Sequence, residues 1–210
     1  MAHFYDRVMK QSEEACLIEW RRALLKNVSG HVLEVGAGTG TTLSLYPKTP
    51  ERIIFSEPDP HMRAQLADRI KTGGFTAAGI SDGSLESLPF PDGEFDSVTC
   101  MLVLCSVPDL DRAIGEIRRV LVPGGRLLFM EHVAAEDHTT TLKWQRRLEP
   151  VWKRVSGNCH FTRRTEQAIL DGGFRMESIQ RESMRKSIPV TRPTIRGIAV
   201  RQSRWTPVSR

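Results

Sequence analysis

A glycine-rich segment, Gly36-Ala-Gly-Thr-Gly40, follows directly after the short apolar run His31–Val35 and constrains this sequence more than any other feature. An apolar run of this length predicts a buried strand, and the glycines let the backbone turn tightly and approach a ligand closely. The threonines within residues 39–42 are suited to cap a helix that begins there. The segment therefore predicts a strand, a turn and a helix N-terminus, an arrangement shared by dinucleotide-binding and nucleoside-binding domains.

Apolar runs and helical patterns alternate along the rest of the chain. Helices are expected over residues 4–28, 60–71 and 110–121, and strands over 52–56, 75–80, 95–101 and 126–132. Strands that alternate with helices at this spacing predict a doubly wound α/β sheet. Farther along, helices are expected over 141–155 and 164–171, and a final antiparallel hairpin over 174–181 and 195–201. Trp144 and Trp152 are expected to pack in the core, with an apolar substrate wall as the alternative.

The composition is typical of one globular domain that spans residues 1–210. Of the 210 residues, 40% are hydrophobic and 26% are charged, and no internal repeat or linker is visible. The four cysteines form no CxxC pair, so they are expected to be reduced thiols rather than metal ligands. The N-terminus has no apolar signal segment, and no run of 18 or more apolar residues occurs, so we expect a cytoplasmic protein.

Charge is unevenly distributed along the chain. Residues 139–210 contain 16 Lys and Arg against 5 Asp and Glu, a net charge of +11, whereas residues 1–138 carry a net charge of −6. The arginine pairs at 146–147 and 163–164 are expected to be mostly solvated, although a basic C-terminal third is also suited to peripheral contact with an anionic membrane. No zinc knuckle, RGG tract or aromatic-rich strand pair accompanies these cations, so no nucleic-acid partner is expected.

Two acidic residues narrow the class of ligand. Glu34 stands two positions before the first glycine, and Glu57 follows the second expected strand, 21 residues after Gly36. The GxGxG spacing differs from the GxGxxG that clamps a pyrophosphate, and a carboxylate after the second strand can accept both hydroxyls of a ribose. These features favour a nucleoside that carries a ribose and no diphosphate.

The order of the motifs resembles that of the class I S-adenosylmethionine-dependent methyltransferases. The matching segments are EVGAGTG at 34–40, Glu57, SLESLPF at 84–90, FDSVTCMLVL at 95–104 and RRVLVPGG at 118–125. The resemblance implies S-adenosyl-L-methionine as cofactor, no metal, and an α/β Rossmann-like three-layer sandwich whose seven-stranded mixed sheet has an antiparallel last strand. It divides the domain into an N-terminal lid helix (1–28), a cofactor-binding core (29–133) and substrate-side helices with the final hairpin (134–210).

The same resemblance implies roles for individual residues. The glycine loop would cradle the methionine and ribose, Glu57 would hold the ribose hydroxyls, residues 84–86 would cap the adenine, and residues 100–102 would lie beside the sulfonium. Ser84 stands where the family often has Asp, and Glu86 or Asp82 is the substitute acceptor. The implied cofactor-binding residues are Tyr5, Glu34, Gly36, Ala37, Gly38, Gly40, Glu57, Pro58, Ser84, Leu85, Glu86, Cys100, Met101 and Leu102.

A narrower similarity connects the chain with the methyltransferase-like alkyl thiol methyltransferases. It rests on VLCSVPD at 103–109, MEHV at 130–133 and WQRRLEPVWKRVSGNCHFTR at 144–163. The similarity implies methyl transfer to a small acceptor with an apolar body, and a thiol is the favoured acceptor. Transfer to oxygen, nitrogen or carbon of a phenol, amine, lipid headgroup or quinone is the alternative.

Candidate catalytic groups lie outside the position where the family often has histidines, because here that position reads Leu104-Cys-Ser-Val-Pro108. His132 ends the strand expected over 126–132, at the sheet edge where ligands bind in open α/β folds, and is a candidate base or substrate contact. Glu131 is expected to orient His132 or a cationic substrate. His160 is expected to enter the substrate side.

Two other classes of function remain as alternatives at this point. A nicotinamide-dependent dehydrogenase is disfavoured by the GxGxG spacing, and NADH binding would reveal one. A non-catalytic nucleic-acid module would retard duplex DNA in a salt-dependent manner.

Overall fold

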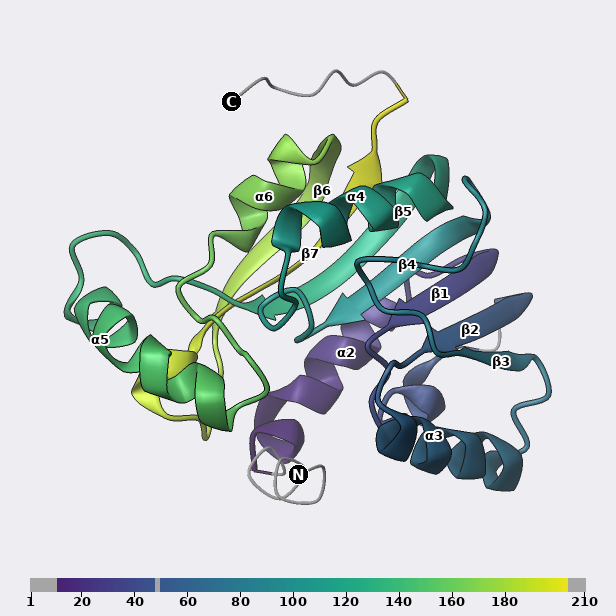
Figure 1. Ribbon diagram of the computed structural model, residues 1–210, viewed down its shortest axis with the longest axis horizontal. Coiled ribbons are helices and arrows are strands. Elements are labelled where there is room, and N and C mark those ends of the chain that lie inside the picture. Colours follow the sequence, from purple (N-terminus) through teal and green to yellow (C-terminus); the bar gives the residue numbers. More distant parts are fainter. Residues whose placement is uncertain (1–10, 48–49, 204–210) are drawn as a thin grey trace.

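The computed structural model describes residues 11–47 and 50–203 and contains one seven-stranded sheet in the order β3-β2-β1-β4-β5-β7-β6 (Figure 1). Neighbouring strands from β3 to β5 are parallel, whereas β7 runs antiparallel to both β5 and β6. The expected mixed sheet with an antiparallel last strand is confirmed. The strands are β1 (His31–Val35), β2 (Arg52–Ser56), β3 (Ala78–Ser81), β4 (Phe95–Met101), β5 (Leu121–His132), β6 (Phe174–Ser183) and β7 (Pro193–Arg201).

Helices cover both faces of the sheet and complete three layers (Figure 1). One face carries η1 (Glu13–Leu17), α2 (Ile18–Leu25), η2 (Leu43–Leu45) and α3 (Pro60–Gly73), and the other carries α4 (Leu110–Val120) and α6 (Thr165–Asp171). Beyond the tips of β4 and β5 lies α5 (Thr140–Val155), against which the short helix η3 (Pro189–Thr191) packs.

Side chains of the central strands supply a core on each face of the sheet. Leu33, Val98 and Phe129 belong to the core beneath α4, whereas Leu128 and Met130 belong to the core beneath α2. Successive side chains of a strand point to opposite faces, so a sheet covered on both faces needs apolar residues at nearly every position. This requirement explains the mostly apolar sequences of the continuously buried segments 97–101 of β4 and 127–132 of β5.

The strand order reverses beside β1, because β2 and β3 extend to one side of it while β4 and β5 extend to the other. Open α/β sheets bind ligands at the carboxyl ends of the strands where such a reversal occurs. The loops that follow β1, β2, β4 and β5 meet at this edge. These loops, together with the strand ends from which they leave, contain most of the residues that the sequence motifs selected.

Several local predictions differ from the structure, among them the third strand, which begins at Ala78 rather than at residue 75. No α-helix follows the glycine loop, because Pro47 holds Tyr46 in an extended conformation (φ −64°, ψ 137°) and only η2 forms before it. The fifth strand begins at Leu121 rather than at residue 126. Trp144 is half exposed instead of buried in the core. The N-terminal helix ends at residue 25 rather than 28, and residues 4–10 of the expected helix lie outside the described residues.

The described residues provide neither a membrane-spanning helix nor a metal-binding cluster. None of their helices is long and apolar enough to cross a bilayer. Within the same residues no group of three or more His, Cys, Asp or Glu side chains is placed to hold a metal ion, and the four cysteines are buried free thiols.

Replacing Gly197 of β7 with alanine is expected to lower the free energy of unfolding by about 1–3 kcal/mol, because overpacking strains a well-packed core. A Cβ at this position would lie 2.3 Å from the carbonyl oxygen of Ser178 and 3.0 Å from the ring of Phe129. Gly115→Ala is the matched control: α4 leaves open space around Gly115, so this change should raise stability by about 0.5–1 kcal/mol. Urea denaturation measures both, and wild-type stability of Gly197→Ala would contradict the packing.

Candidate functional site

The glycine loop turns sharply at the carboxyl end of β1. Gly36, Gly38 and Gly40 all have positive φ angles, of 62°, 58° and 82°, which glycine adopts without steric cost. A Cβ on Gly36 would lie 2.4 Å from the Val103 side chain, so this glycine is needed for packing against the loop after β4. A Cβ on Gly38 would meet nothing within 4 Å. The loop therefore presents a bare backbone to open space at Gly38.

Glu34 supports this loop from beneath. Its carboxylate accepts hydrogen bonds from the hydroxyls of Thr42 (2.7 and 2.8 Å) and Tyr46 (2.7 Å), and Tyr46 also contacts the hydroxyl of Thr99 at 2.8 Å. Burial raises the pKa of Glu34 to about 6, although these hydroxyl bonds and the charge of Arg21 oppose the shift. Both carboxylate oxygens of Glu34 thus have partners within the protein.

Glu57 joins the end of β2 to the glycine loop. One carboxylate oxygen accepts the backbone N–H of Gly38 at 2.8 Å, and the other accepts the backbone N–H of Asp59 at 2.9 Å. The carbonyls of Glu57 and of the adjacent Pro58 both accept from the Arg63 guanidinium. The acidic side chain expected at the ribose is therefore fixed beside the bare backbone of Gly38.

The turn after β3 forms the next wall of this edge. A bridge pairs Ser84 with Ser87, and Leu85 between them is buried in the core beneath α4. The Oε1 atom of Glu86 is buried and has no hydrogen-bond partner among the described residues, whereas Asp82 is exposed. Of the two acceptors proposed to substitute for the family's Asp, Glu86 is therefore the one that has a buried, unused oxygen.

The loop after β4 is held by a buried carboxylate. Glu131, at the end of the neighbouring β5, accepts the backbone N–H groups of Val103 (3.1 Å), Leu104 (3.1 Å) and Cys105 (3.0 Å). Burial raises the pKa of Glu131 to about 7, and the three backbone bonds hold it below the value that burial alone would give. Leu102 turns into this loop with a φ of 64°. Residues 100–102 are thereby fixed at the edge of the sheet.

The expected pairing of Glu131 with His132 is wrong. Neighbouring side chains of a strand project to opposite faces, and Glu131 shares its face with the Cys100 thiol, 3.5 Å away. His132 projects to the other face, on which Met130, Met101 and Leu102 pack. Glu131 and His132 therefore contact different parts of the protein, and Glu131 positions the loop after β4 rather than the imidazole of His132.

His132 combines burial with an unused nitrogen. Its side chain is only 7% exposed, and its Nδ1 atom has no hydrogen-bond partner among the described residues. Burial lowers the pKa of His132 to about 4, although a hydrogen bond with the Thr191 backbone opposes the shift. The imidazole is therefore neutral at physiological pH and keeps one buried nitrogen without a hydrogen-bond partner at the carboxyl end of β5.

His160 has partners on both ring nitrogens. Nδ1 lies 3.5 Å from a carboxylate oxygen of Glu149, and Nε2 lies 3.3 Å from the side-chain oxygen of Asn158. The backbone N–H of His160 donates to the carbonyl of Cys105 at 2.7 Å. Burial, followed by the charges of Arg163 and Lys153, lowers the pKa of His160. These contacts make His160 a connection between the α5–α6 segment and the loop after β4.

Arg163 is a site residue that the sequence did not reveal. Its guanidinium donates to the carbonyls of Leu104 and Val107, on the loop that Glu131 holds from the other side. Its expected role as a solvated surface cation is wrong. A pair of adjacent arginines is a surface pattern, and nothing in the local sequence distinguishes the half-buried Arg163 from the exposed Arg164.

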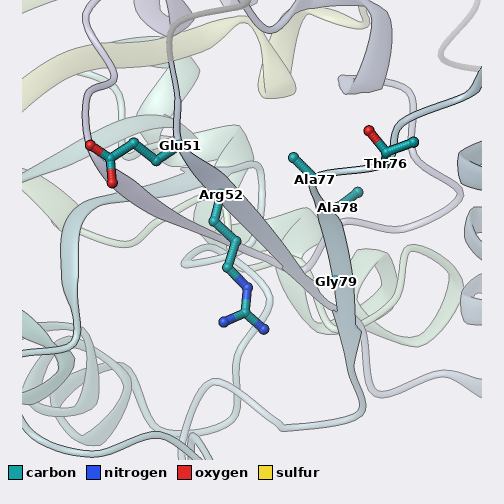
Figure 2. Close-up of a pocket in the computed structure, with 6 residues that line it drawn as sticks. All are labelled: Glu51, Arg52, Thr76, Ala77, Ala78 and Gly79. Carbon is teal, nitrogen blue, oxygen red and sulfur yellow. The ribbon is translucent and has the colours of Figure 1, made fainter.

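A shallow hollow of about 370 Å³ lies at the opposite end of the sheet (Figure 2). It is lined by Glu51, Arg52 and residues 76–79, where β2 and β3 begin. None of the residues selected from the motifs lines it. The candidate site is therefore the edge formed by the carboxyl ends of the strands.

Comparison with known proteins decides the family. A family model for a methyltransferase domain matches residues 33–129. The chain is 36% identical over 173 residues to thiol S-methyltransferase TMT1A of Homo sapiens, a match that covers 81% of this chain and 70% of the relative. The chain belongs to the class I S-adenosylmethionine-dependent methyltransferases.

Two further comparisons place this methyltransferase within its family. It is 33% identical over 141 residues to demethylmenaquinone methyltransferase of Thermobifida fusca, which covers 63% of this chain and 59% of the relative. A crystal structure of an S-adenosylmethionine-dependent methyltransferase from Mesorhizobium loti is similar with a TM-score of 0.69, over 89% of this chain and 99% of that chain. At 19% identity, the latter similarity shows the fold alone.

Family membership gives S-adenosyl-L-methionine as the cofactor and a small molecule as the methyl acceptor. The described residues fit this cofactor. Gly38 leaves open space, the Glu57 carboxylate lies beside it within reach of ribose hydroxyls, and the unused Oε1 of Glu86 can accept from an adenine amino group. Tyr5, expected in the lid, lies outside the described residues.

Glu57→Ala is expected to weaken binding of S-adenosylmethionine by about 1.5–3 kcal/mol, because charge-assisted hydrogen bonds to the ribose are lost. Titration calorimetry of the purified variant measures the change. Glu51→Ala, on an exposed carboxylate that directly precedes β2 at the opposite end of that strand from Glu57, is the control and should leave the affinity unaltered. Unchanged affinity in Glu57→Ala would remove Glu57 from the cofactor site.

Proposed function

We propose that this methyltransferase methylates the sulfur of small thiols with apolar bodies. The identity to a thiol S-methyltransferase supports this acceptor, because it extends over 173 residues, well beyond the 33–129 segment that the general methyltransferase model matches. The unused nitrogen of buried His132 is the observation that carries the proposal chemically.

Methyl transfer to a thiol requires the protein to align the two reactants and to accept one proton. The bound cofactor supplies a methyl group on a sulfonium, a carbon already activated for in-line attack by a sulfur nucleophile. A free thiol has a pKa of about 8.5, so only a few per cent is thiolate at neutral pH. Holding the reactants in line contributes roughly 7–11 kcal/mol in favourable cases.

His132 is suited to receive the thiol proton as the methyl group reaches the sulfur and the S–H bond becomes strongly acidic. A pKa of about 4 leaves His132 too weak to deprotonate the free thiol beforehand. Its imidazole is neutral because burial lowers its pKa, and Nδ1 has a free lone pair toward which an S–H group can donate. Met101, Met130 and Leu102 lie on the same face and give this position an apolar lining suited to an alkyl or aryl body. The acceptor sulfur would lie between this nitrogen and the residues that end β4.

A second acceptor class has its own support. The 33% identity to a demethylmenaquinone methyltransferase favours a quinone-type carbon or phenol oxygen on the same site. Both acceptor classes have apolar bodies, so the fold does not separate them and the reacting atom must be found by assay.

The test is release of S-adenosylhomocysteine against a panel of alkyl and aryl thiols, phenols, quinols and amines. Turnover of thiols is expected, and His132→Gln should lower it at neutral pH by about 10²-fold, as loss of a general base does. The loss should shrink as the assay pH approaches the pKa of the thiol, because a preformed thiolate needs no base. His61→Gln, on exposed α3, is the matched control with wild-type rates expected.

Turnover of phenols, quinols or amines without thiols would overturn the proposed acceptor and favour the second class. Thiol turnover that His132→Gln leaves intact at every pH would keep the acceptor and remove His132 as its base.

A further inference from the structure

Four large apolar side chains form an exposed stripe along α5. Trp144, Leu148, Val151 and Val155 are 50%, 40%, 62% and 65% exposed, and their spacing of four, three and four residues places them on one side of the helix. Ile188, 48% exposed, directly precedes η3, which packs against α5. We call these five residues the α5 apolar face. They are five of the eight large hydrophobic side chains that are exposed in the described part of the chain.

Buried polar contacts fix this orientation of α5. Gln145 is fully buried, donates to the carbonyls of Val133 (3.1 Å) and Val190 (2.9 Å), and accepts from the backbone N–H of Ala135 (2.8 Å). The helix thus turns Gln145 and Leu142 toward the protein and leaves a second apolar stripe facing solvent. Rolling α5 to bury the stripe would break three hydrogen bonds. The exposed face is therefore a fixed feature of the fold.

Cations border the α5 apolar face without acidic partners. Lys143, Arg147 and Arg154 flank the stripe along one side of α5, and Arg146 lies farther round the helix. No ion pair between described residues includes any of these four exposed cations. The guanidinium of Arg147 lies 5.8 Å from the centre of the Trp144 ring. The acidic residue of this helix, Glu149, instead accepts the N–H of Thr162 and lies beside His160. The surface is thus both apolar and uniformly positive.

We propose that the α5 apolar face docks this enzyme on the surface of an anionic phospholipid bilayer. Tryptophan and aliphatic side chains enter the boundary between headgroups and acyl chains, and bordering Lys and Arg bind anionic headgroups. A second copy of the chain is disfavoured as the occupant, because two such faces packed together would bring their unpaired cations into contact. The helix α5 lies beyond the tips of β4 and β5, at the same end of the sheet as the candidate cofactor site (Figure 1).

The experiment is co-sedimentation of the full chain with two kinds of vesicle, pure phosphatidylcholine and phosphatidylcholine with about 30% phosphatidylserine. Binding to the anionic vesicles is expected to be at least about tenfold stronger and to weaken in about 0.5 M salt, where surface charges are screened. The double variant Leu148→Asp/Val151→Asp should lose at least about tenfold of that binding. Leu170→Asp, on the similarly exposed apolar side chain of α6, is the matched control and should bind like wild type.

A second pair of measurements keeps the proposal testable if the double variant fails to fold. Arg147→Glu/Arg154→Glu should abolish the preference for anionic vesicles, and the Trp144 emission should shift to shorter wavelength on binding, a shift absent in Trp144→Phe. Equal binding to both vesicle types, or wild-type binding by both double variants, would overturn the proposal. Light scattering without lipid tests the other occupant. A wild-type dimer that dissociates in Leu148→Asp/Val151→Asp would also overturn the proposal and assign the face to a second copy. None of these measurements depends on thiol turnover, so the outcome for the docking surface is independent of the outcome for the proposed acceptor.

Discussion

One buried carboxylate holds the loop on which the site depends. Glu131 takes up the N–H groups of three consecutive residues, Val103 to Cys105, from a fully buried position at the end of β5. An ionised carboxylate can accept several such bonds, and without them its burial would be costly. The end of β5 therefore fixes the backbone that leaves β4. Residues 100–102, which the family motifs assign to the sulfonium side, are positioned by this contact between two strands.

The carbonyl groups of the same loop are bound from the opposite side. Arg163 and the backbone N–H of His160 donate to the carbonyls of Leu104, Val107 and Cys105. The Glu131 carboxylate therefore accepts hydrogen bonds from the N–H groups of this loop, and the segment with His160 and Arg163 donates hydrogen bonds to its carbonyl groups. That segment follows α5 and belongs to the half of the domain expected to shape the acceptor site. The fold thus joins the expected cofactor-binding core (29–133) to the expected substrate-side helices through one short stretch of fully bonded backbone.

Much of this architecture could be predicted from the sequence. The continuous apolar run at 95–101 and the strand–turn pattern around the glycine loop fixed two central strands, and the distance from Gly36 to Glu57 placed a carboxylate beside the loop. The direction of the Glu131 side chain could also be predicted from the sequence, because the side chains of neighbouring strand residues point to opposite faces and cannot both line one site. The expected pairing of Glu131 with His132 overlooked that alternation.

Other features depend on contacts that no local pattern contains. Arg163 and Arg164 are adjacent and chemically alike, and only the distant carbonyls of the loop after β4 make Arg163 a structural clamp. The apolar periodicity of α5 indicated a buried face for Trp144, yet the helix is rolled so that Gln145 faces inward. Periodicity shows that one side of a helix is apolar, and tertiary hydrogen bonds decide which side faces the protein.

The most direct test of this account is the affinity for S-adenosylmethionine of wild type and Glu131→Gln, measured by calorimetry from about pH 6 to pH 8, the range around the Glu131 pKa of about 7. The ionised carboxylate is the form that accepts three N–H groups, so wild-type affinity should rise as the pH increases through this range. The variant should bind about tenfold more weakly at pH 8 and show no rise in affinity with pH. The amide N–H groups of glutamine would face the N–H groups of the loop and could not accept hydrogen bonds from them. Thermal unfolding of the variant checks that the fold is retained. Wild-type affinity in folded Glu131→Gln at every pH would contradict the claim that this carboxylate builds the site.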